Sequence, residues 1–178
     1  MIFGDSKSTS SKEWTTALRD SLSAKTYGGV GLQNAAVAGE SVATALAAMD
    51  AKLAAMPTDL SGVNYRKVLM NWGVNDGCAD TATWETNYLA IIDKVHAKAP
   101  NADVYLMRPW MRGYACTAAL HASIDTIVAA RAFARIGPDE AIWLENGDNG
   151  ATNTVDGVHY STAGNAACAA QWQTVLGY

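Results

Sequence analysis

Three short motifs contain residue types that could carry out catalysis. Gly-Asp-Ser occupies positions 4–6, Asp156 and His159 lie three residues apart, and Asn75 lies two positions after Gly73. A serine hydroxyl becomes a good nucleophile when an adjacent base takes its proton, and histidine often serves as that base. One turn could present both Asp156 and His159 to such a serine. Taken singly, Ser6 is also a common helix cap, and an Asp-x-x-His pair is also a helix start or half of a metal site.

The rest of the chain alternates between two kinds of apolar pattern. Short runs rich in β-branched and aromatic residues predict five buried strands, at residues 1–3, 31–37, 67–72, 103–107 and 141–144. Helical spacing of apolar residues predicts helices between them, which contain residues 14–22, 42–56, 84–95, 120–128 and 168–176. Ser161 or Thr162 would cap the last helix. This alternation is typical of an α/β fold, with a parallel sheet between two layers of helices.

Most of the polar residues that could do chemistry lie where a predicted strand ends. In an open parallel sheet, ligands bind beyond the carboxyl ends of the strands, at the point where the strand order reverses. The segments at this edge would be residues 4–6, 38–40, 73–76 and 108–110, with the long loop 146–159. The predicted fold would therefore bring Ser6, Asn75 and His159 to one side of the molecule.

The composition is that of a folded domain. Apolar residues make up 49 % of the 178 residues and charged residues 17 %, which excludes a disordered chain. The length predicts one domain that spans residues 1–178. Thirteen Lys and Arg against seventeen Asp and Glu leave a net charge of −4, without a basic footprint. No apolar run approaches the ~20 residues of a membrane helix, and no signal segment opens the chain. We therefore expect neither nucleic acid nor a membrane as partner.

Four motifs occur in a fixed order along the chain. They are Phe3-Gly4-Asp5-Ser6, Asn34 through Gly39, Trp72-Gly73-Val74-Asn75-Asp76, and Asp156-Gly157-Val158-His159 through Gly164. In letters, order and spacing they resemble the motifs of the SGNH hydrolases, the GDSL-type esterases. Residues 100–106 look like the fourth strand of that family, and the resemblance covers essentially the whole chain. It implies a flavodoxin-like, three-layer α/β/α fold with a five-stranded parallel sheet in the order 2-1-3-4-5.

The resemblance also implies a role for each motif. Ser6 would be the nucleophile, His159 the base that takes its proton, and Asp156 the group that orients the imidazole. The backbone N–H groups of Ser6 and Gly39, with the side-chain amide of Asn75, would form the oxyanion hole. We expect no metal, because no third His or Cys ligand lies near Asp156 and His159, and no other cofactor.

Position 7 departs from the family pattern, which usually has an aliphatic residue directly after the serine. This chain has Lys7, which we expect to point into solvent. Among the aromatic residues that follow the strands, Trp72 is predicted to lie in the core. Trp110, between two arginines, and Tyr160 are predicted to contact the acyl or sugar part of a substrate.

The three cysteines and two further histidines are less informative. Cys78 and Cys116 follow strands that would be neighbours, so they form either a disulfide or two free thiols. A disulfide would imply an oxidising compartment, secreted or periplasmic, whereas the chain alone indicates no location. Cys168 is predicted to be a small core residue. His96 and His121 are predicted to lie at the surface or its boundary.

These observations predict a serine esterase that acts on small or acetyl esters through an acyl-enzyme. Its partner would be a small-molecule or saccharide ester, and the aromatic residues favour carbohydrate de-acetylation. The alternatives are an acyltransferase or thioesterase that uses the same site, and a ligand-binding module that has kept the fold without catalysis. The oligomeric state is not predicted.

Overall fold

A parallel β-sheet lies at the centre of the computed structural model, which describes residues 1–9, 13–26, 33–56, 66–145 and 147–178. The described part of the sheet has four strands in the order β1-β2-β3-β4, with bounds Ile2–Gly4, Lys67–Asn71, Asp103–Arg108 and Ala134–Asp139. All three neighbouring pairs are parallel. Parallel neighbours require crossover connections, and helices supply them here. The predicted α/β class is confirmed.

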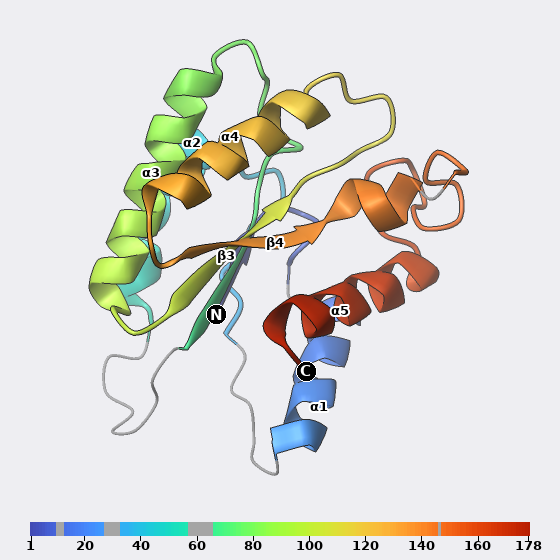
Figure 1. Ribbon diagram of the computed structural model, residues 1–178, viewed down its shortest axis with the longest axis horizontal. Coiled ribbons are helices and arrows are strands. Elements are labelled where there is room, and N and C mark those ends of the chain that lie inside the picture. Colours follow the sequence, from blue (N-terminus) through green and yellow to red (C-terminus); the bar gives the residue numbers. More distant parts are fainter. Residues whose placement is uncertain (10–12, 27–32, 57–65, 146) are drawn as a thin grey trace.

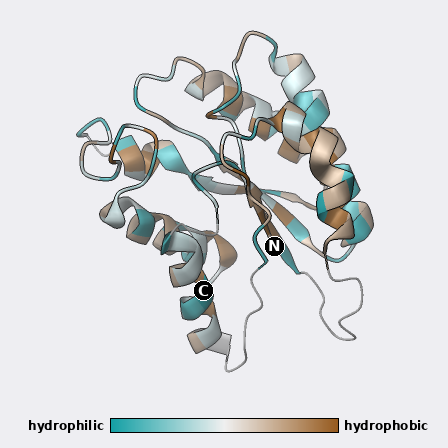
Figure 2. Cartoon of the chain, turned by 180° about the vertical axis from the view of Figure 1, so that it is seen from behind, coloured by the Kyte–Doolittle hydropathy of each residue, from teal (hydrophilic) through white to brown (hydrophobic). Residues whose placement is uncertain are grey.

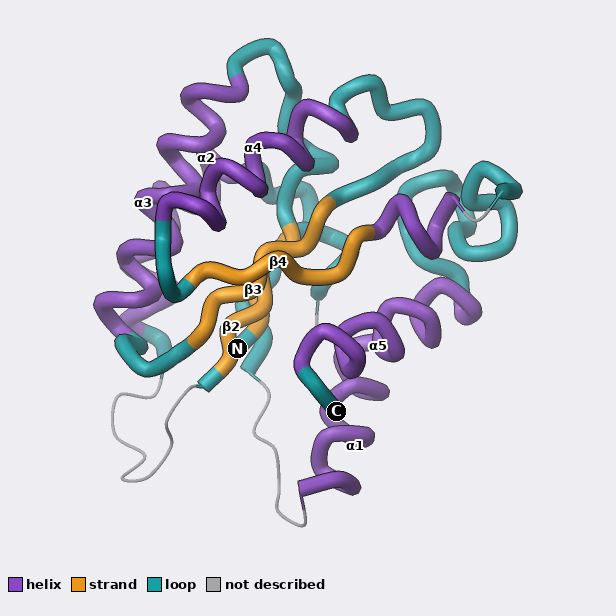
Figure 3. Tube along the Cα trace, in the orientation of Figure 1, coloured by secondary structure: helices purple, strands orange, loops and turns teal. Residues whose placement is uncertain are grey.

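Helices cover both faces of the sheet (Figure 1). On one face, α1 (Glu13–Thr26) packs against α5 (Thr162–Leu176). On the other face, α3 (Thr81–Lys98) lies between α2 (Val42–Ala54) and α4 (Thr117–Ala130). Figure 3 shows the strands between these two groups of helices. The three predicted layers are therefore present.

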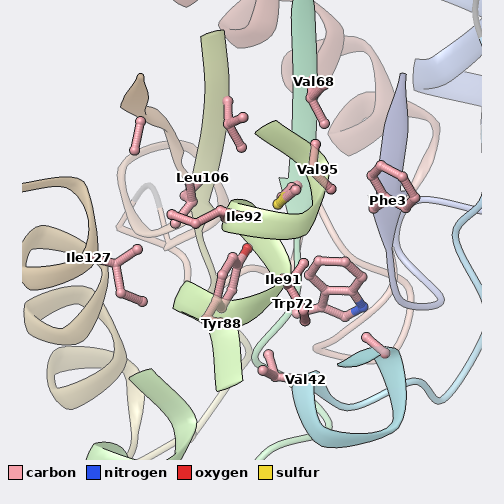
Figure 4. Close-up of a cluster of buried hydrophobic side chains, with 14 of the residues drawn as sticks. Phe3, Val42, Val68, Trp72, Tyr88, Ile91, Ile92, Val95, Leu106 and Ile127 are labelled. Atoms are coloured by element: carbon pink, nitrogen blue, oxygen red, sulfur yellow. The ribbon is translucent and has the colours of Figure 1, made fainter. Parts of the chain in front are cut away.

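Successive residues of a strand enter two different hydrophobic clusters, because both faces of the sheet are buried. On β2, Val68 and Met70 belong to the cluster under α2, α3 and α4, whereas Leu69 belongs to the cluster under α1 and α5. In the first cluster the ring of Trp72 packs edge-on against Tyr88, with 5.7 Å between ring centroids (Figure 4). Trp72 is fully buried, as predicted. Figure 2 shows apolar residues along the central strands and mixed colours on the helices, as expected for elements with one buried side.

The strand predicted at residues 31–37 is only partly visible, since residues 31 and 32 lie outside the described part. Residues 33–37 run beside β1, on the edge opposite β2. The N–H of Ile2 donates to the carbonyl of Gln33 at 2.8 Å, and the N–H of Val37 donates to the carbonyl of Gly4 at 2.9 Å. One parallel bridge, between Ile2 and Asn34, is formed. This segment therefore occupies the place of the second strand in the expected order, without being a regular strand.

The strand predicted at residues 141–144 is wrong. The last strand is β4 (Ala134–Asp139), and Ala141–Glu145 form a short π-helix, η1. Gly137 and Pro138 interrupt the apolar pattern of β4, so the pattern did not predict a strand there. Both residues are nevertheless compatible with their places in this strand. A β-carbon on Gly137 would lie 2.9 Å from the backbone of β3, and proline is tolerated in an edge strand such as β4.

Cys78 and Cys116 form a disulfide, which decides between the two possibilities that the sequence leaves open. Their Cα atoms are 5.3 Å apart, and 38 positions separate them along the chain. The bond joins the loop that precedes α3 to the residue that precedes α4. Cys168 is a buried free thiol in the cluster under α1 and α5, as predicted.

Three predictions about helix ends and surface residues are confirmed. The hydroxyl of Ser161 caps α5 by accepting the N–H of Gly164 at 3.1 Å. His96 is partly exposed and stacks on Phe133, while the partly exposed ring of His121 lies against the loop after β3.

Of the helices in the described ranges, none is long and apolar enough to cross a membrane.

Candidate active site

Ser6, His159 and Asp156 form one hydrogen-bonded row at the carboxyl end of the sheet. The Nε2 atom of His159 lies 3.0 Å from Oγ of Ser6, although 153 positions separate the two residues. The Nδ1 atom of the same ring lies 2.7 Å from Oδ2 of Asp156. An imidazole that donates from Nδ1 to a carboxylate presents an unprotonated Nε2 to the hydroxyl, which a general base requires. The structure thus brings together the three residues predicted as a triad.

Ser6 lies in a tight turn directly after β1. The N–H of Ser8 donates to the carbonyl of Asp5 at 3.0 Å, and the N–H of Lys7 donates to Oδ1 of Asp5 at 2.9 Å. Burial raises the pKa of Asp5 to about 7, although the charge and the N–H of Lys7 act in the opposite direction. Because α1 begins only at position 13, Ser6 does not cap this helix. Its hydroxyl is half-buried and faces His159.

A short loop carries both Asp156 and His159. It closes through a hydrogen bond from the N–H of Val155 to the carbonyl of His159 at 2.9 Å. The Oδ1 atom of Asp156 accepts the N–H groups of Val158 at 2.9 Å and of His159 at 2.7 Å. The hydrogen bond from the His159 ring, with these two N–H groups, holds the pKa of Asp156 well below its usual range. Asp156 therefore stays ionised and can stabilise a protonated imidazole.

Gly39 and Asn75, the other predicted oxyanion donors, lie on two exposed loops that meet at Glu40. The Nδ2 atom of Asn75 donates to the backbone carbonyl of Glu40 at 3.3 Å. A side-chain amide carries two N–H groups, so the second can still serve a substrate. Gly39 has a φ of +76°, a left-handed conformation that favours glycine. Among the described residues, no atom lies within 4 Å of a β-carbon placed there, so the backbone angle and not crowding requires the glycine.

The carboxylate of Glu40 anchors these loops from the interior, which the sequence pattern does not reveal. Glu40 is 6 % exposed, and its two oxygens accept the Nζ of Lys52 at 2.6 and 2.7 Å. One of them also accepts the indole N–H of Trp72 at 3.1 Å. Lys52 lies on α2 and donates to the carbonyl of Ala35 at 3.0 Å as well. These contacts hold the residue that follows Gly39 against both the sheet and α2.

Lys7 does not point into solvent, and that prediction is wrong. Its side chain is fully buried, and Nζ lies 2.7 Å from Oε2 of Glu140. Nζ also donates to the backbone carbonyl of Trp110. The family usually has an aliphatic residue at this position, which already indicated that the position is an interior one. A lysine in the interior requires a partner such as a carboxylate. Glu140 supplies it from the position directly after β4, the strand that the sequence pattern did not predict.

Trp110 and Tyr160 are interior residues, so they do not have the substrate contacts predicted for them. They are 5 % and 6 % exposed and belong to the cluster under α1 and α5. The backbone N–H of Trp110 donates to Oε2 of Glu140 at 2.6 Å, and the Tyr160 hydroxyl donates to Oε1. A tyrosine is readily buried when its hydroxyl has a partner, and here the partner is a carboxylate. Protein covers both rings.

A hollow of about 270 Å³ adjoins the loop of Asn75. The starts of α2 and α3 and the loop between Asn75 and α3 line it, through Val42, Ala43, Asp76, Gly77, Ala79, Asp80, Thr83, Trp84 and Asn87. Asp76 closes one side, because its Oδ1 accepts the N–H of Val42 at 2.9 Å, and burial raises its pKa. Within the described ranges, the structure groups no three His, Cys, Asp or Glu side chains as a metal site.

The comparison with protein families agrees with this geometry. Residues 2–167 match the model of the GDSL-like lipase/acylhydrolase family. The chain belongs to this family. The resemblance seen in the four motifs is thereby confirmed, and membership supports an ester-hydrolysing activity. No curated protein sequence matches the chain significantly.

Several solved structures share the fold of this GDSL-family protein over nearly its whole length. The acetyl xylan esterase AlAXEase is 22 % identical, with a TM-score of 0.75 and 98 % of each chain covered. TesA is 20 % identical, with a TM-score of 0.79 and coverage of 98 % of this chain and 96 % of its own. The psychrotrophic esterase EstA from Pseudoalteromonas sp. is 20 % identical, with a TM-score of 0.74 and coverage of 99 % and 96 %. At these identities the likeness establishes the fold.

Proposed function

We propose that this protein is a serine esterase that hydrolyses small esters through an acyl-enzyme intermediate. The row of hydrogen bonds from Ser6 through His159 to Asp156, at 3.0 and 2.7 Å, carries this proposal. It supplies a nucleophile, a base within reach of the nucleophile's proton, and an anion that orients the base.

In the first half-reaction, Nε2 of His159 takes the proton of Ser6 while Oγ attacks the ester carbonyl carbon. The resulting imidazolium is stabilised by the Asp156 carboxylate. When the tetrahedral intermediate collapses, the bond to the alcohol oxygen breaks and His159 donates its proton to that oxygen. In the second half-reaction, His159 takes a proton from water, which attacks the acyl group on Ser6. The carboxylic acid leaves, and Ser6 recovers its proton.

The negative charge on the former carbonyl oxygen needs N–H donors that are already in place. The candidates are the backbone N–H groups of Ser6 and Gly39 and the Nδ2 of Asn75. The contact between Asn75 and Glu40 keeps the two loops together, and the buried Glu40–Lys52 pair keeps Gly39 near the sheet. None of the three donors carries a charge that must be neutralised before it acts.

Acetylated carbohydrate is the substrate class that we favour. Gly39, Asn75 and Asp156 are exposed, which suits an open site and a bulky alcohol part. The adjoining hollow of about 270 Å³ has room for a small group. Two of the structural neighbours are an acetyl xylan esterase and a family 3 carbohydrate esterase. The latter, from Clostridium thermocellum, is 18 % identical with a TM-score of 0.71 and coverage of 98 % and 92 %.

The test is turnover of p-nitrophenyl acetate, p-nitrophenyl butyrate and acetylated xylan by the Ser6→Ala variant. We expect the activity to fall by at least ~10³-fold, because the nucleophile is lost. Ser8→Ala is the matched control, since the buried Ser8 hydroxyl makes no hydrogen bond within the described residues. Unchanged activity of the Ser6→Ala variant would reject the serine mechanism. A wild-type protein that binds esters without turnover would instead be a ligand-binding module.

Acyl transfer and thioester hydrolysis would use the same acyl-enzyme. Water must resolve the intermediate in an esterase, whereas an alcohol resolves it in an acyltransferase. Chromatography of the products formed with added glycerol or xylose separates the two, because transfer yields a new ester. An acyl thioester offered beside the oxygen ester of the same acid tests the thioesterase alternative.

The disulfide supports an oxidising compartment, secreted or periplasmic. Disulfides persist outside the reducing cytosol, and the Cys78–Cys116 bond joins two loops near the candidate site. Fractionation of the source cells, with mass measurement under non-reducing conditions, tests this proposal.

A further inference from the structure

The three side chains of Lys7, Glu140 and Tyr160 form a buried cluster beneath the triad. Lys7 and Glu140 are fully buried and Tyr160 is 6 % exposed. Oε2 of Glu140 accepts the Nζ of Lys7 at 2.7 Å, and Oε1 accepts the Tyr160 hydroxyl. The Nζ of Lys7 also lies 5.6 Å from the centre of the Tyr160 ring. One carboxylate thus joins two residues that are 153 positions apart in the chain.

The covalent neighbours of this cluster are the reacting groups themselves. Lys7 directly follows Ser6, and Tyr160 directly follows His159. The cluster therefore links the same two backbone segments that the Ser6–His159 hydrogen bond links. It does so from the interior, whereas that hydrogen bond lies at the half-exposed surface. Glu140, which holds the shared carboxylate, directly follows β4.

We propose that Glu140, with Lys7 and Tyr160, is a positioning device that sets the distance between Oγ of Ser6 and Nε2 of His159. The inference rests on the proposed function, in which these two atoms exchange the proton. None of the three side chains touches the substrate. They act by holding the backbone on either side of the reacting pair.

The bonding of the cluster suits this role. Both oxygens of Glu140 have donors, because the N–H of Trp110 joins the Nζ of Lys7 on Oε2 at 2.6 Å. Burial and the charge of Glu140 raise the pKa of Tyr160, so its hydroxyl keeps the proton that it donates. Two further hydrogen bonds hold the backbone beside Lys7. The N–H of Asp5 donates to the carbonyl of Asn71 at 3.1 Å, and the indole N–H of Trp14 donates to the carbonyl of Lys7 at 2.8 Å.

A positioning role explains why a charged pair is kept where an aliphatic residue would pack. Taking two charges out of water costs much of what their attraction returns, so a buried pair is often no more stabilising than apolar side chains. Such a pair does impose one geometry, because leaving either charge unpaired in the interior is costly. Proton transfer is sensitive to geometry, and a misplacement of about 1 Å can cost on the order of 10²-fold in rate.

The first test is Tyr160→Phe, which removes the hydroxyl and keeps the ring packed on Trp143. We expect kcat for p-nitrophenyl acetate to fall about 10-fold or more with KM within about two-fold, as for an interaction that acts in the transition state. Inactivation of Ser6 by diethyl p-nitrophenyl phosphate should slow by the same factor. Tyr105→Phe is the matched control. Tyr105 is 8 % exposed in the same cluster, and its hydroxyl meets Lys67 at 3.5 Å, away from the triad.

The second test is the double variant Lys7→Met/Glu140→Gln, which removes both charges and keeps an oxygen acceptor at position 140. We expect a folded protein whose kcat falls about 10-fold or more, again with little change in KM. The rate at which diethyl p-nitrophenyl phosphate inactivates Ser6 should fall by the same factor. Unchanged kcat in Tyr160→Phe and in the double variant would overturn the inference. The inference would also be overturned if Tyr160→Phe and Tyr105→Phe lost kcat equally and in proportion to their loss of thermal stability. Ser6→Ala separates the two levels, since activity that survives it rejects the proposed function, whereas loss of activity only there rejects the positioning role alone.

Discussion

The backbone carbonyl of Asn71 lies 2.6 Å from the position that a β-carbon on Gly4 would take. Gly4 ends β1, Asn71 ends β2, and the two residues pair in register. The N–H of Asp5 donates to the same carbonyl at 3.1 Å. The missing side chain at position 4 therefore allows the turn that carries Ser6 to lie directly against β2.

Gly4→Ala should move this turn, because the backbone of β2 cannot yield as a flexible side chain could. We expect the free energy of unfolding to fall by about 1–3 kcal/mol, the usual effect of overpacking. We expect kcat to fall at least ~10-fold, since Ser6 lies two residues away. Urea unfolding and ester turnover measure the two effects. For the unfolding measurement the control is Gly77→Ala, where the nearest atom would lie 4.0 Å from the new β-carbon. Wild-type kcat in Gly4→Ala would show that the close approach has no part in catalysis.

Asn75→Ala should lower kcat without preventing folding. Losing one oxyanion donor typically costs about 10²–10³-fold in kcat, and KM should change little because the charge develops only in the transition state. Asn75 is exposed, so its removal leaves no cavity. Steady-state kinetics on p-nitrophenyl acetate measures the effect, with the exposed Asn101 changed to alanine as control. If the kcat of the two variants were equal, Asn75 would not be a donor.

Asp5 should make the protein less stable as the pH rises from about 4 to about 7. Burial raises its pKa to about 7 in the folded state, from 3.8 for an ordinary aspartate. In that window the folded state holds a proton that the unfolded state has released, so the free energy of unfolding falls with rising pH. Asp5→Asn keeps an acceptor for the N–H of Lys7 and removes the titration. The free energy of unfolding, measured with urea, should therefore fall for the wild type relative to the variant as the pH rises from 4 to 7. The relative change should be on the order of a few kcal/mol. A constant difference across this range would contradict the raised pKa.

Reduction of the Cys78–Cys116 bond should destabilise the protein. The bond closes a loop between residues 38 positions apart, and releasing such a loop costs about 3–4 kcal/mol through the entropy of the unfolded chain. Thermal unfolding with and without dithiothreitol measures the loss. The double variant Cys78→Ser/Cys116→Ser should match the reduced protein and should not respond to the reductant. If the reductant also destabilised this variant, its effect would not come from the disulfide.

Local patterns predicted most of the fold, and the motifs predicted the three residues that the structure brings into one hydrogen-bonded row. The apolar spacing identified the central strands and the helices, because each must bury one or both faces. The motifs around Ser6, Asn75 and His159 lie at strand ends, where a parallel sheet brings distant segments together. Residues 141–144 misled the prediction because η1 buries Trp143 and Leu144 as a strand would, while Gly137 and Pro138 made β4 look like a loop.

By itself the sequence predicted the α/β class, the family through its four motifs, and the three residues that the structure joins in one hydrogen-bonded row. These depend on residue types and spacings that are local to one strand or one turn. Only the tertiary structure decided the burial of Lys7 and Tyr160, the pairing of both with Glu140, and the bond between Cys78 and Cys116. The reason is physical: whether a charged or aromatic side chain lies inside depends on a partner far away in the chain, and only the packed fold brings that partner within bonding distance.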